Sequence, residues 1–390
     1  MSRMHRRRFL YAYAACLPSL LRAAPKNDLV IRNGRVIDPS QRLDRVTDVA
    51  IRDGKIAAIG HGLQGAETMD ATGKLVAPGL IDIHLHARDA ELPPSAILST
   101  GVTTIVDAGS RGADNVDQLI GIARDAPNRM RILLNIGRLG NNPNRRGEFL
   151  DGIEPADVEK ARAAVEKNRA WIIGIKARLS RSVAADHDLE ILRRAQQVAA
   201  PLNIPVMIHI GDSASPLAQI LALLRPGDIV THMYTPVNGI FDAQGHVLPE
   251  VRAARRRGII FDFGNGRTEH WTWASAQNGL AQGFAPDTIS SDLDLAGHTE
   301  QVFDLPTVLS KFLAMGMPLP QVIACATVNA SKVFPEFKSY GSLRPGAPAD
   351  VSVFELTEGS FEFVDNYKTN RTGRQKLVAR AVIVGGKRFV

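Results

Sequence analysis

The chain has 390 residues, which is long enough for one large domain and a smaller one. Hydrophobic residues make up 45% and charged residues 22%, a composition typical of an ordinary globular protein. The formal net charge is +7, but residues 1–24 hold five arginines and no acidic residue, so the remainder carries 7 − 5 = +2. A remainder this close to neutral gives no basis for nucleic-acid binding.

Residues 1–24 have the pattern of an export signal. The basic string Arg6-Arg7-Arg8 precedes a short apolar run through Leu21, and the small pair Ala23-Ala24 follows. The string resembles a twin-arginine signal, which directs folded proteins across the bacterial inner membrane. An uncleaved membrane anchor is the alternative, and the shortness of the apolar run disfavours it. We therefore predict an exported, periplasmic protein with no stable membrane span after signal removal. Cys325 would then be its only cysteine.

Short β-strand patterns lie near both ends of the chain. Over residues 28–60, Asn33-Gly34 and Asp53-Gly54 stand between runs rich in β-branched residues, which is the sequence pattern of β-hairpins. Strand patterns return after Phe334. We expect residues 25–77 and 336–390 to pair into one small β-sandwich domain built from both chain ends.

Between these segments, strand and helix patterns alternate eight times over about 250 residues, which is the size of a (β/α)₈ TIM barrel. The strands are apolar throughout, as in a parallel sheet that is buried on both faces. We predict that residues 78–335 form this barrel. The eight barrel strands are expected at 80–86, 102–107, 131–136, 171–176, 205–209, 228–232, 259–263 and 288–292. The helices are expected at 116–126, 155–168 and 188–200, after 216, and at 249–257, 275–282 and 306–315.

Six side chains that can bind a metal ion fall at the ends of the expected barrel strands. Side chains alternate along a strand, so His84 and His86 share one face at the end of the first strand. In barrels of this type the chemistry lies at the C-terminal ends of the strands. Each residue alone could be a core histidine, a helix cap or an ion-paired lysine, but six on one rim indicate a site for divalent metal ions. The other four are Lys176, His209, His232 and Asp292.

These motifs resemble those of the amidohydrolase superfamily of metal-dependent hydrolases, over nearly all of residues 28–390. Within it, Phe303-Asp304-Leu305-Pro306 and residues 311–317 make the chain most similar to the amidohydrolase/deacetylase branch, whose members resemble dihydroorotases. The resemblance rests on Pro78-Gly79-Leu80-Ile81-Asp82-Ile83-His84-Leu85-His86, Gly174-Ile175-Lys176-Ala177-Arg178, His209, His232, Ser291-Asp292 and residues 341–351.

The resemblance implies a site with two divalent metal ions. His84 and His86 would hold the buried ion, and His209 and His232 would hold the more exposed one. Lys176, carboxylated by carbon dioxide, would bridge both ions, because an ammonium has no lone pair whereas a carbamate offers two oxygens. Mixed nitrogen and oxygen ligands favour zinc, with manganese or cobalt as alternatives.

Asp292 would ligate the first ion and act as the general base toward a hydroxide shared by the two ions. Asp294 is the rival for this role because it lies on the same strand face. Asp82 is expected to support a metal ligand without binding the metal itself.

Three arginines are candidates for substrate binding. The string from His84 to Arg88 matches the His-x-His-x-Arg of dihydroorotases, in which the arginine holds the substrate carboxylate. Arg178 has the same spacing from Lys176, and Arg267 lies in the segment after the seventh strand, where relatives often carry a histidine at the position of Asn265. The alternative is that Arg88 pairs with Asp89 or Asp107 and only shapes the rim.

We therefore predict a hydrolase of amide, cyclic amide or ester bonds with a small acylated molecule as its substrate. A deacetylase of N-acyl amino acids or O-acyl hydroxy acids is favoured. A dihydroorotase-type cyclic amidohydrolase is the alternative, and the export signal counts against it because pyrimidine synthesis is cytosolic. A non-catalytic barrel relative that acts in assembly is an alternative from another class, but such relatives lose ligands. The sequence leaves the exact substrate and homo-oligomerisation open.

Overall fold

The computed structural model describes residues 27–88, 90–141 and 148–389. The predicted export signal at residues 1–24 lies outside these ranges and stays a prediction. Within them, every helix is too short or too polar to cross a lipid bilayer.

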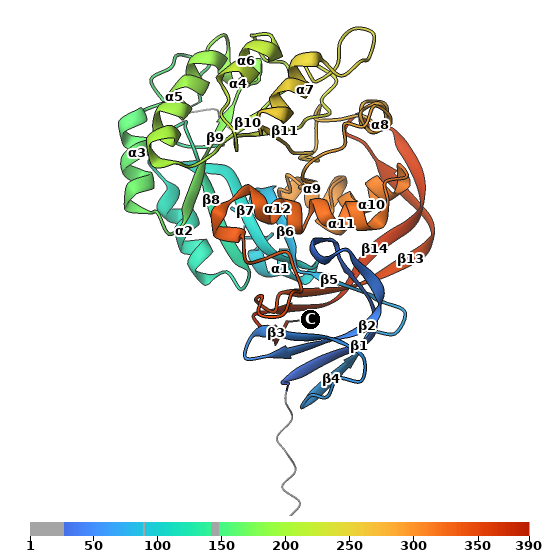
Figure 1. Cartoon of the computed structure of the whole chain (residues 1–390). Coiled ribbons are helices and arrows are strands. Elements are labelled where there is room, and N and C mark those ends of the chain that lie inside the picture. Colours follow the sequence, from blue (N-terminus) through green and yellow to red (C-terminus); the bar gives the residue numbers. More distant parts are fainter. Residues whose placement is uncertain (1–26, 89, 142–147, 390) are drawn as a thin grey trace, which may run out of the picture.

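A parallel sheet of seven strands forms the centre of the molecule, with helices around it (Figure 1). Its strands follow one another in chain order, which confirms the predicted barrel topology. Val106, Leu133, Met207 and Ile229 come from four of these strands and pack with Phe334 in one buried cluster. The strands are β6 (Leu80–Leu85), β7 (Val102–Gly112), β8 (Arg129–Asn135), β9 (Ile172–Arg178), β10 (Val206–His209), β11 (Ile229–Thr231) and β12 (Ile260–Phe261).

The eighth strand expected at 288–292 is not a regular strand. Isolated bridges join Thr288 to Asp262 on one side and Leu293 to Leu85 on the other, so this segment still closes the barrel between β12 and β6. The pairing is irregular because Asp292 has a left-handed backbone conformation, with φ +48°. The predicted strand was therefore correct in position and wrong in regularity.

The helices of the barrel lie outside the sheet, and most of them are short. The helix expected to begin at Pro155 begins instead at Val158, because the Asp157 side chain accepts a hydrogen bond from the Lys160 backbone N–H and caps it there. The helices are α1 (Pro94–Ser99), α2 (Val116–Asp125), α3 (Val158–Lys167), α4 (Arg181–Ala184), α5 (Asp188–Leu202), α6 (Leu217–Leu223), α7 (Pro249–Arg256), α8 (Trp273–Ala281), α9 (Leu295–Glu300), α10 (Leu305–Ala314), α11 (Leu319–Cys325) and α12 (Val328–Val333).

Strands from both chain ends form one small domain, as predicted. They belong to a single, mostly antiparallel sheet of eight strands, in which β13 from the C-terminal part pairs with β5 from the N-terminal part. This sheet has its own buried core, which includes Val36, Val76 and Val353. Its strands are β1 (Leu29–Asp38), β2 (Leu43–Arg52), β3 (Lys55–Gly60), β4 (Glu67–Asp70), β5 (Leu75–Pro78), β13 (Val351–Val364), β14 (Asn370–Val384) and β15 (Lys387–Arg388).

Of the two predicted hairpins, only the one at Asp53-Gly54 exists, where β2 turns into β3 with both turn residues at positive φ. The prediction of a hairpin at Asn33-Gly34 is wrong, because β1 continues through both residues with a bulge. The bulge allows the first half of β1 to pair with β4 and the second half with β5. This arrangement depends on strands more than 30 residues away, so the local pattern could not reveal it.

The long hairpin of β13 and β14 extends from the small domain along the side of the barrel (Figure 1). The Ser310 hydroxyl of α10 accepts a hydrogen bond from the Leu377 backbone N–H of this hairpin at 2.9 Å. At the hairpin turn, Asp365 and Asn366 accept hydrogen bonds from the backbone of Trp273 and His270, respectively. The turn of the small domain therefore supports the loop that follows the seventh barrel strand.

Candidate metal centre

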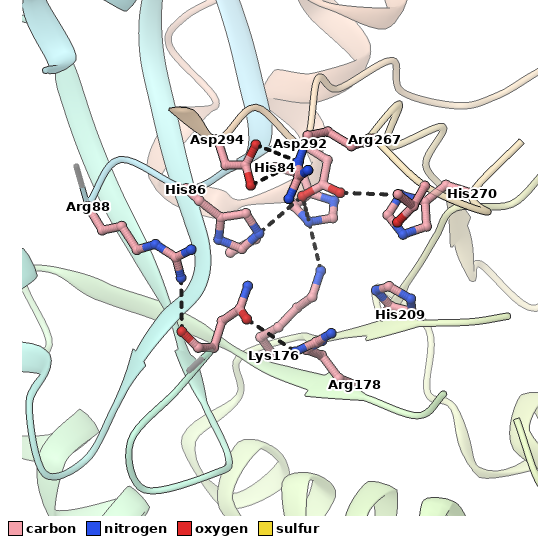
Figure 2. Close-up of a pocket in the computed structure, with 13 residues that line it drawn as sticks. His84, His86, Arg88, Lys176, Arg178, His209, Arg267, His270, Asp292 and Asp294 are labelled. Carbon is pink, nitrogen blue, oxygen red and sulfur yellow. Dashed lines mark hydrogen bonds and ion pairs between the residues drawn. The ribbon is translucent and has the colours of Figure 1, made fainter. Parts of the chain in front are cut away.

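The closure of the barrel brings His84, His86 and Asp292 together (Figure 2). The Asp292 backbone N–H donates to the His84 carbonyl at 2.6 Å, and the His86 backbone N–H donates to the Leu293 carbonyl at 2.8 Å. As a result, one carboxylate oxygen of Asp292 lies 3.1 Å from Nε2 of His84 and 3.1 Å from Nε2 of His86. The two histidines and the aspartate therefore converge on one point.

Lys176, at the end of β9, reaches the same point from across the barrel. Its Nζ atom is 3.0 Å from Nε2 of His84, and its side chain is almost completely buried. Burial lowers the pKa of the Lys176 ammonium to about 7, against the opposing charge of Asp292. Because of this lowered pKa, a substantial fraction of the Lys176 amine is neutral near neutral pH. Glycine at position 109 leaves room for the lysine, since a β-carbon there would lie only 2.7 Å from the Lys176 side chain.

His209 ends β10, His232 follows β11, and both lie next to the first group. One ligand atom from each of His84, His232 and Asp292 lies within 4.8 Å of the others, and so does one from each of His209, His232 and His270. His270 is a residue that sequence reasoning missed, because it lies on a loop with no fixed spacing from a strand end. The structure thus brings together all six residues predicted as ligands, together with a fifth histidine.

His232 and Asp292 both have left-handed backbone conformations, at φ +63° and +48°. Neither residue type adopts this conformation without a cost, and such strain is concentrated at functional sites. Although burial opposes ionisation of Asp292, the neighbouring histidines hold the pKa of its carboxyl well below the usual value. The carboxylate is therefore charged where it faces the imidazoles.

Hydrogen bonds from outside the site fix which ring nitrogen of His84 and of His86 carries the proton. The Thr231 hydroxyl donates to Asp262 at 2.7 Å, so it can only accept from Nδ1 of His84, 2.9 Å away. The Ser110 hydroxyl likewise donates to Asp107 at 2.7 Å and accepts from Nδ1 of His86 at 2.8 Å. Hydroxyl–carboxylate pairs of this kind orient metal-binding histidines.

The donor set fits divalent metal ions. His232 donates from Nδ1 to the Gly264 carbonyl at 2.7 Å, and its buried Nε2 has no hydrogen-bond partner among the described residues. Burial, together with the neighbouring imidazoles, lowers the pKa values of His209 and His232 well below the usual range, so both rings are neutral. Neutral imidazoles are ligands that zinc and related ions bind.

Asp82 and Asp294 have other contacts. Asp82 lies beneath the site, where its carboxylate accepts from the Ser291 hydroxyl and from the His84 backbone N–H at 3.2 Å. Asp294 caps α9 by accepting from the Gly297 backbone N–H at 2.7 Å, and it pairs with Arg267 at 3.1 Å. Asp292, and not Asp294, is therefore the carboxylate that faces the imidazoles.

A cavity of about 270 Å³ lies over these residues, and all three predicted arginines line it. Arg267 pairs with Asp294, and Arg88 donates to the Asn141 carbonyl at 2.9 Å (Figure 2). Arg178 pairs with Glu148 at 2.7 Å. Guanidinium groups bind carboxylates through paired hydrogen bonds, and two of these three already face a carboxylate of the protein.

The barrel, its rim of polar side chains and the relatives of the chain define a hydrolytic enzyme. The model of the amidohydrolase family matches residues 75–389. The chain therefore belongs to the amidohydrolase family, which confirms the resemblance seen in the motifs. Members of this family usually bind divalent metal ions.

Individual relatives carry several different names. A deacetylase from Enterococcus faecalis is 29% identical over 92% of this chain and 98% of its own length, and a deacetylase from Agrobacterium fabrum is 30% identical over 87% and 86%. A crystal structure of a dihydroorotase matches with a TM-score of 0.83 and 27% identity, over 93% of this chain and 98% of the other. A crystal structure of an adenine deaminase matches with a TM-score of 0.84 and 28% identity, over 93% and 99%.

The hydroxyl that holds His84 provides a test of the site. Thr231→Val keeps the shape of the side chain but removes the acceptor for Nδ1 of His84, so we expect metal affinity to fall by about 10–100-fold. Thr288→Val is the matched control, because Thr288 also donates to Asp262 at 2.7 Å but contacts no ligand histidine. Competition with a chelator measures both variants, and equal losses would show that the Thr231 hydroxyl has no specific effect on the metal.

Proposed function

We propose that the chain is a binuclear metal-dependent hydrolase that removes an acyl group from a small molecule carrying a carboxylate. The favoured substrates are N-acyl amino acids and O-acyl hydroxy acids. One observation carries this proposal: the two histidines at the end of β6, the lysine of β9 and the aspartate of the closing segment meet at the base of a cavity lined by arginines.

In this proposal His84 and His86 would hold one ion, His209 and His232 would hold the other, and Lys176, once carboxylated, would supply an anionic ligand to both. The lowered pKa of Lys176 supports the bridge, because a neutral amine is the form that reacts with carbon dioxide. When bound, two divalent ions, with zinc favoured, would polarise the scissile carbonyl and lower the pKa of water. Burial keeps the imidazoles of His209 and His232 neutral, and the hydroxyl groups of Thr231 and Ser110 orient those of His84 and His86.

Asp292 is proposed as the general base. Its carboxylate is ionised, lines the cavity and faces the histidines, so it can take a proton from the attacking water and pass it to the leaving group. Asp294 is less suited to this role because its carboxylate already pairs with Arg267 and caps α9.

The cavity charge helps to choose among the functions named for the relatives. Adenine carries no carboxylate, so the arginines give no reason to propose adenine as the substrate. Dihydroorotate carries one, and a dihydroorotase-type activity therefore remains the alternative. The deacetylases are 29% and 30% identical to this chain along most of its length, compared with 27% for the dihydroorotase structure, and this supports an acylated substrate. Export, which the N-terminal sequence predicts, would suit an enzyme that scavenges such molecules outside the cytosol.

Removing the bridging residue tests the binuclear site. Lys176→Ala should lose most of its metal and at least about 100-fold in kcat/KM, because two cations are left without their shared anion. A short carboxylic acid at high concentration should restore part of the rate. Lys176→Met is the matched control, since its side chain fills the space and should prevent rescue. If Lys176→Ala binds metal and turns over like the wild type, the bridge is excluded.

Replacing the proposed base tests the proton transfer. Asp292→Asn should lower kcat by about 10²–10⁴-fold, because the amide cannot accept the proton. Asp294→Asn should cost much less, since that carboxylate caps a helix and pairs with an arginine. Steady-state kinetics with metal content measured on the same samples separates loss of the base from loss of metal. The opposite ranking of the two variants would transfer the role to Asp294.

The charge of the substrate tests the role of Arg88. Arg88→Met should reduce kcat/KM for carboxylate substrates by about 10–150-fold, which corresponds to 1.5–3 kcal/mol for a charge-assisted hydrogen bond. Substrates whose carboxylate is esterified or amidated should lose rate with the wild-type enzyme and change little with Arg88→Met. Equal losses with both enzymes would show that Arg88 does not bind this carboxylate.

A further inference from the structure

We propose that His270 is a third imidazole ligand of the more exposed metal ion, in addition to His209 and His232. This inference rests on the proposed binuclear function. The ring of His270 lies 3.7 Å from that of His232 and 5.0 Å from that of His209, and the last two rings are 4.3 Å apart, all measured between ring centroids. One nitrogen from each ring lies within 4.8 Å of the other two.

Two buried nitrogens in this cluster lack partners among the described residues. Nδ1 of His270 and Nε2 of His232 make no hydrogen bond. The nearest acidic oxygen to Nδ1 of His270 is that of Asp292, at 3.5 Å, without hydrogen-bond geometry. A buried polar atom without a partner is costly, so native proteins seldom leave two of them in one cluster. A shared cation would satisfy both lone pairs at once.

The loop after β12 is built to bring this ring into the site. Gly264 and Gly266 have left-handed conformations, and a β-carbon at Gly266 would overlap Nδ1 of His270, so only glycine leaves space for the imidazole. The far end of the loop is fixed from two sides. The Thr235 hydroxyl donates to the Glu269 carbonyl at 3.1 Å, and the Asn366 side chain accepts from the His270 backbone N–H at 3.1 Å.

Asn366 also donates to the Gly266 carbonyl at 3.0 Å, so one side chain of the small domain holds both ends of the segment between Gly266 and His270. The imidazole is therefore held in place by backbone contacts that do not involve its ring. A ring positioned in this way can act as a ligand without ordering a flexible loop, which lowers the entropic cost of binding.

Metal retention by His270→Ala tests the proposal. Loss of an outer partner of a ligand already costs about 10–100-fold in metal affinity, so loss of a ligand should cost at least about 100-fold. Zinc-loaded proteins would be dialysed against increasing chelator and analysed for metal. We expect His270→Ala to lose one equivalent at far lower chelator concentration than the wild type and to keep the other. His246→Ala is the matched control, because His246 is exposed and pairs with Asp242 away from the cavity.

A crystal structure of the zinc-loaded wild type decides the question even where the variant fails to fold. A His270 nitrogen at about 2.0–2.1 Å from the second ion would establish the ligand. Wild-type retention of both ions by His270→Ala, or a zinc ion in the crystal without contact to His270, would overturn the inference. A raised KM with unchanged metal would assign His270 to the substrate instead. Wild-type protein that binds fewer than two ions would refute the proposed function itself.

Discussion

The two backbone hydrogen bonds that close the barrel determine the whole site. They join His84 to Asp292 and His86 to Leu293, and they place a carboxylate from one end of the barrel sequence beside two imidazoles from the other. The left-handed conformation of Asp292 lets this irregular segment face the imidazoles while it still pairs with both neighbours. The cost of that conformation is tolerated because the surrounding barrel fixes it.

Burial then gives the site its chemistry. Desolvation makes Lys176 available as a neutral amine and keeps His209 and His232 neutral, while Asp292 stays ionised among them. These are the protonation states that metal binding requires. The hydroxyl groups of Thr231 and Ser110 orient the imidazoles of His84 and His86, respectively. Each hydroxyl donates to a buried carboxylate, so its oxygen is left to accept from Nδ1 of the histidine.

The sequence was sufficient for features that follow from local periodicity and barrel topology. His84, His86, Lys176 and Asp292 could be placed on one rim because parallel strands end at the same edge. Features that depend on distant contacts could not be predicted. The position of His270 is set by Asn366, 96 residues further along the chain, and the partner of His84 is Thr231, 147 residues away. The sequence did contain a signal for the partner of His84, because Thr231 and Asp262 are polar residues within apolar strand patterns.

The metal content of active wild-type protein, purified without chelator, tests the binuclear site most directly. Elemental analysis should find close to two equivalents of divalent metal per chain, and removal of the metal should abolish hydrolysis of acylated carboxylates until zinc is restored. Fully active protein with metal content near zero would contradict the proposed site.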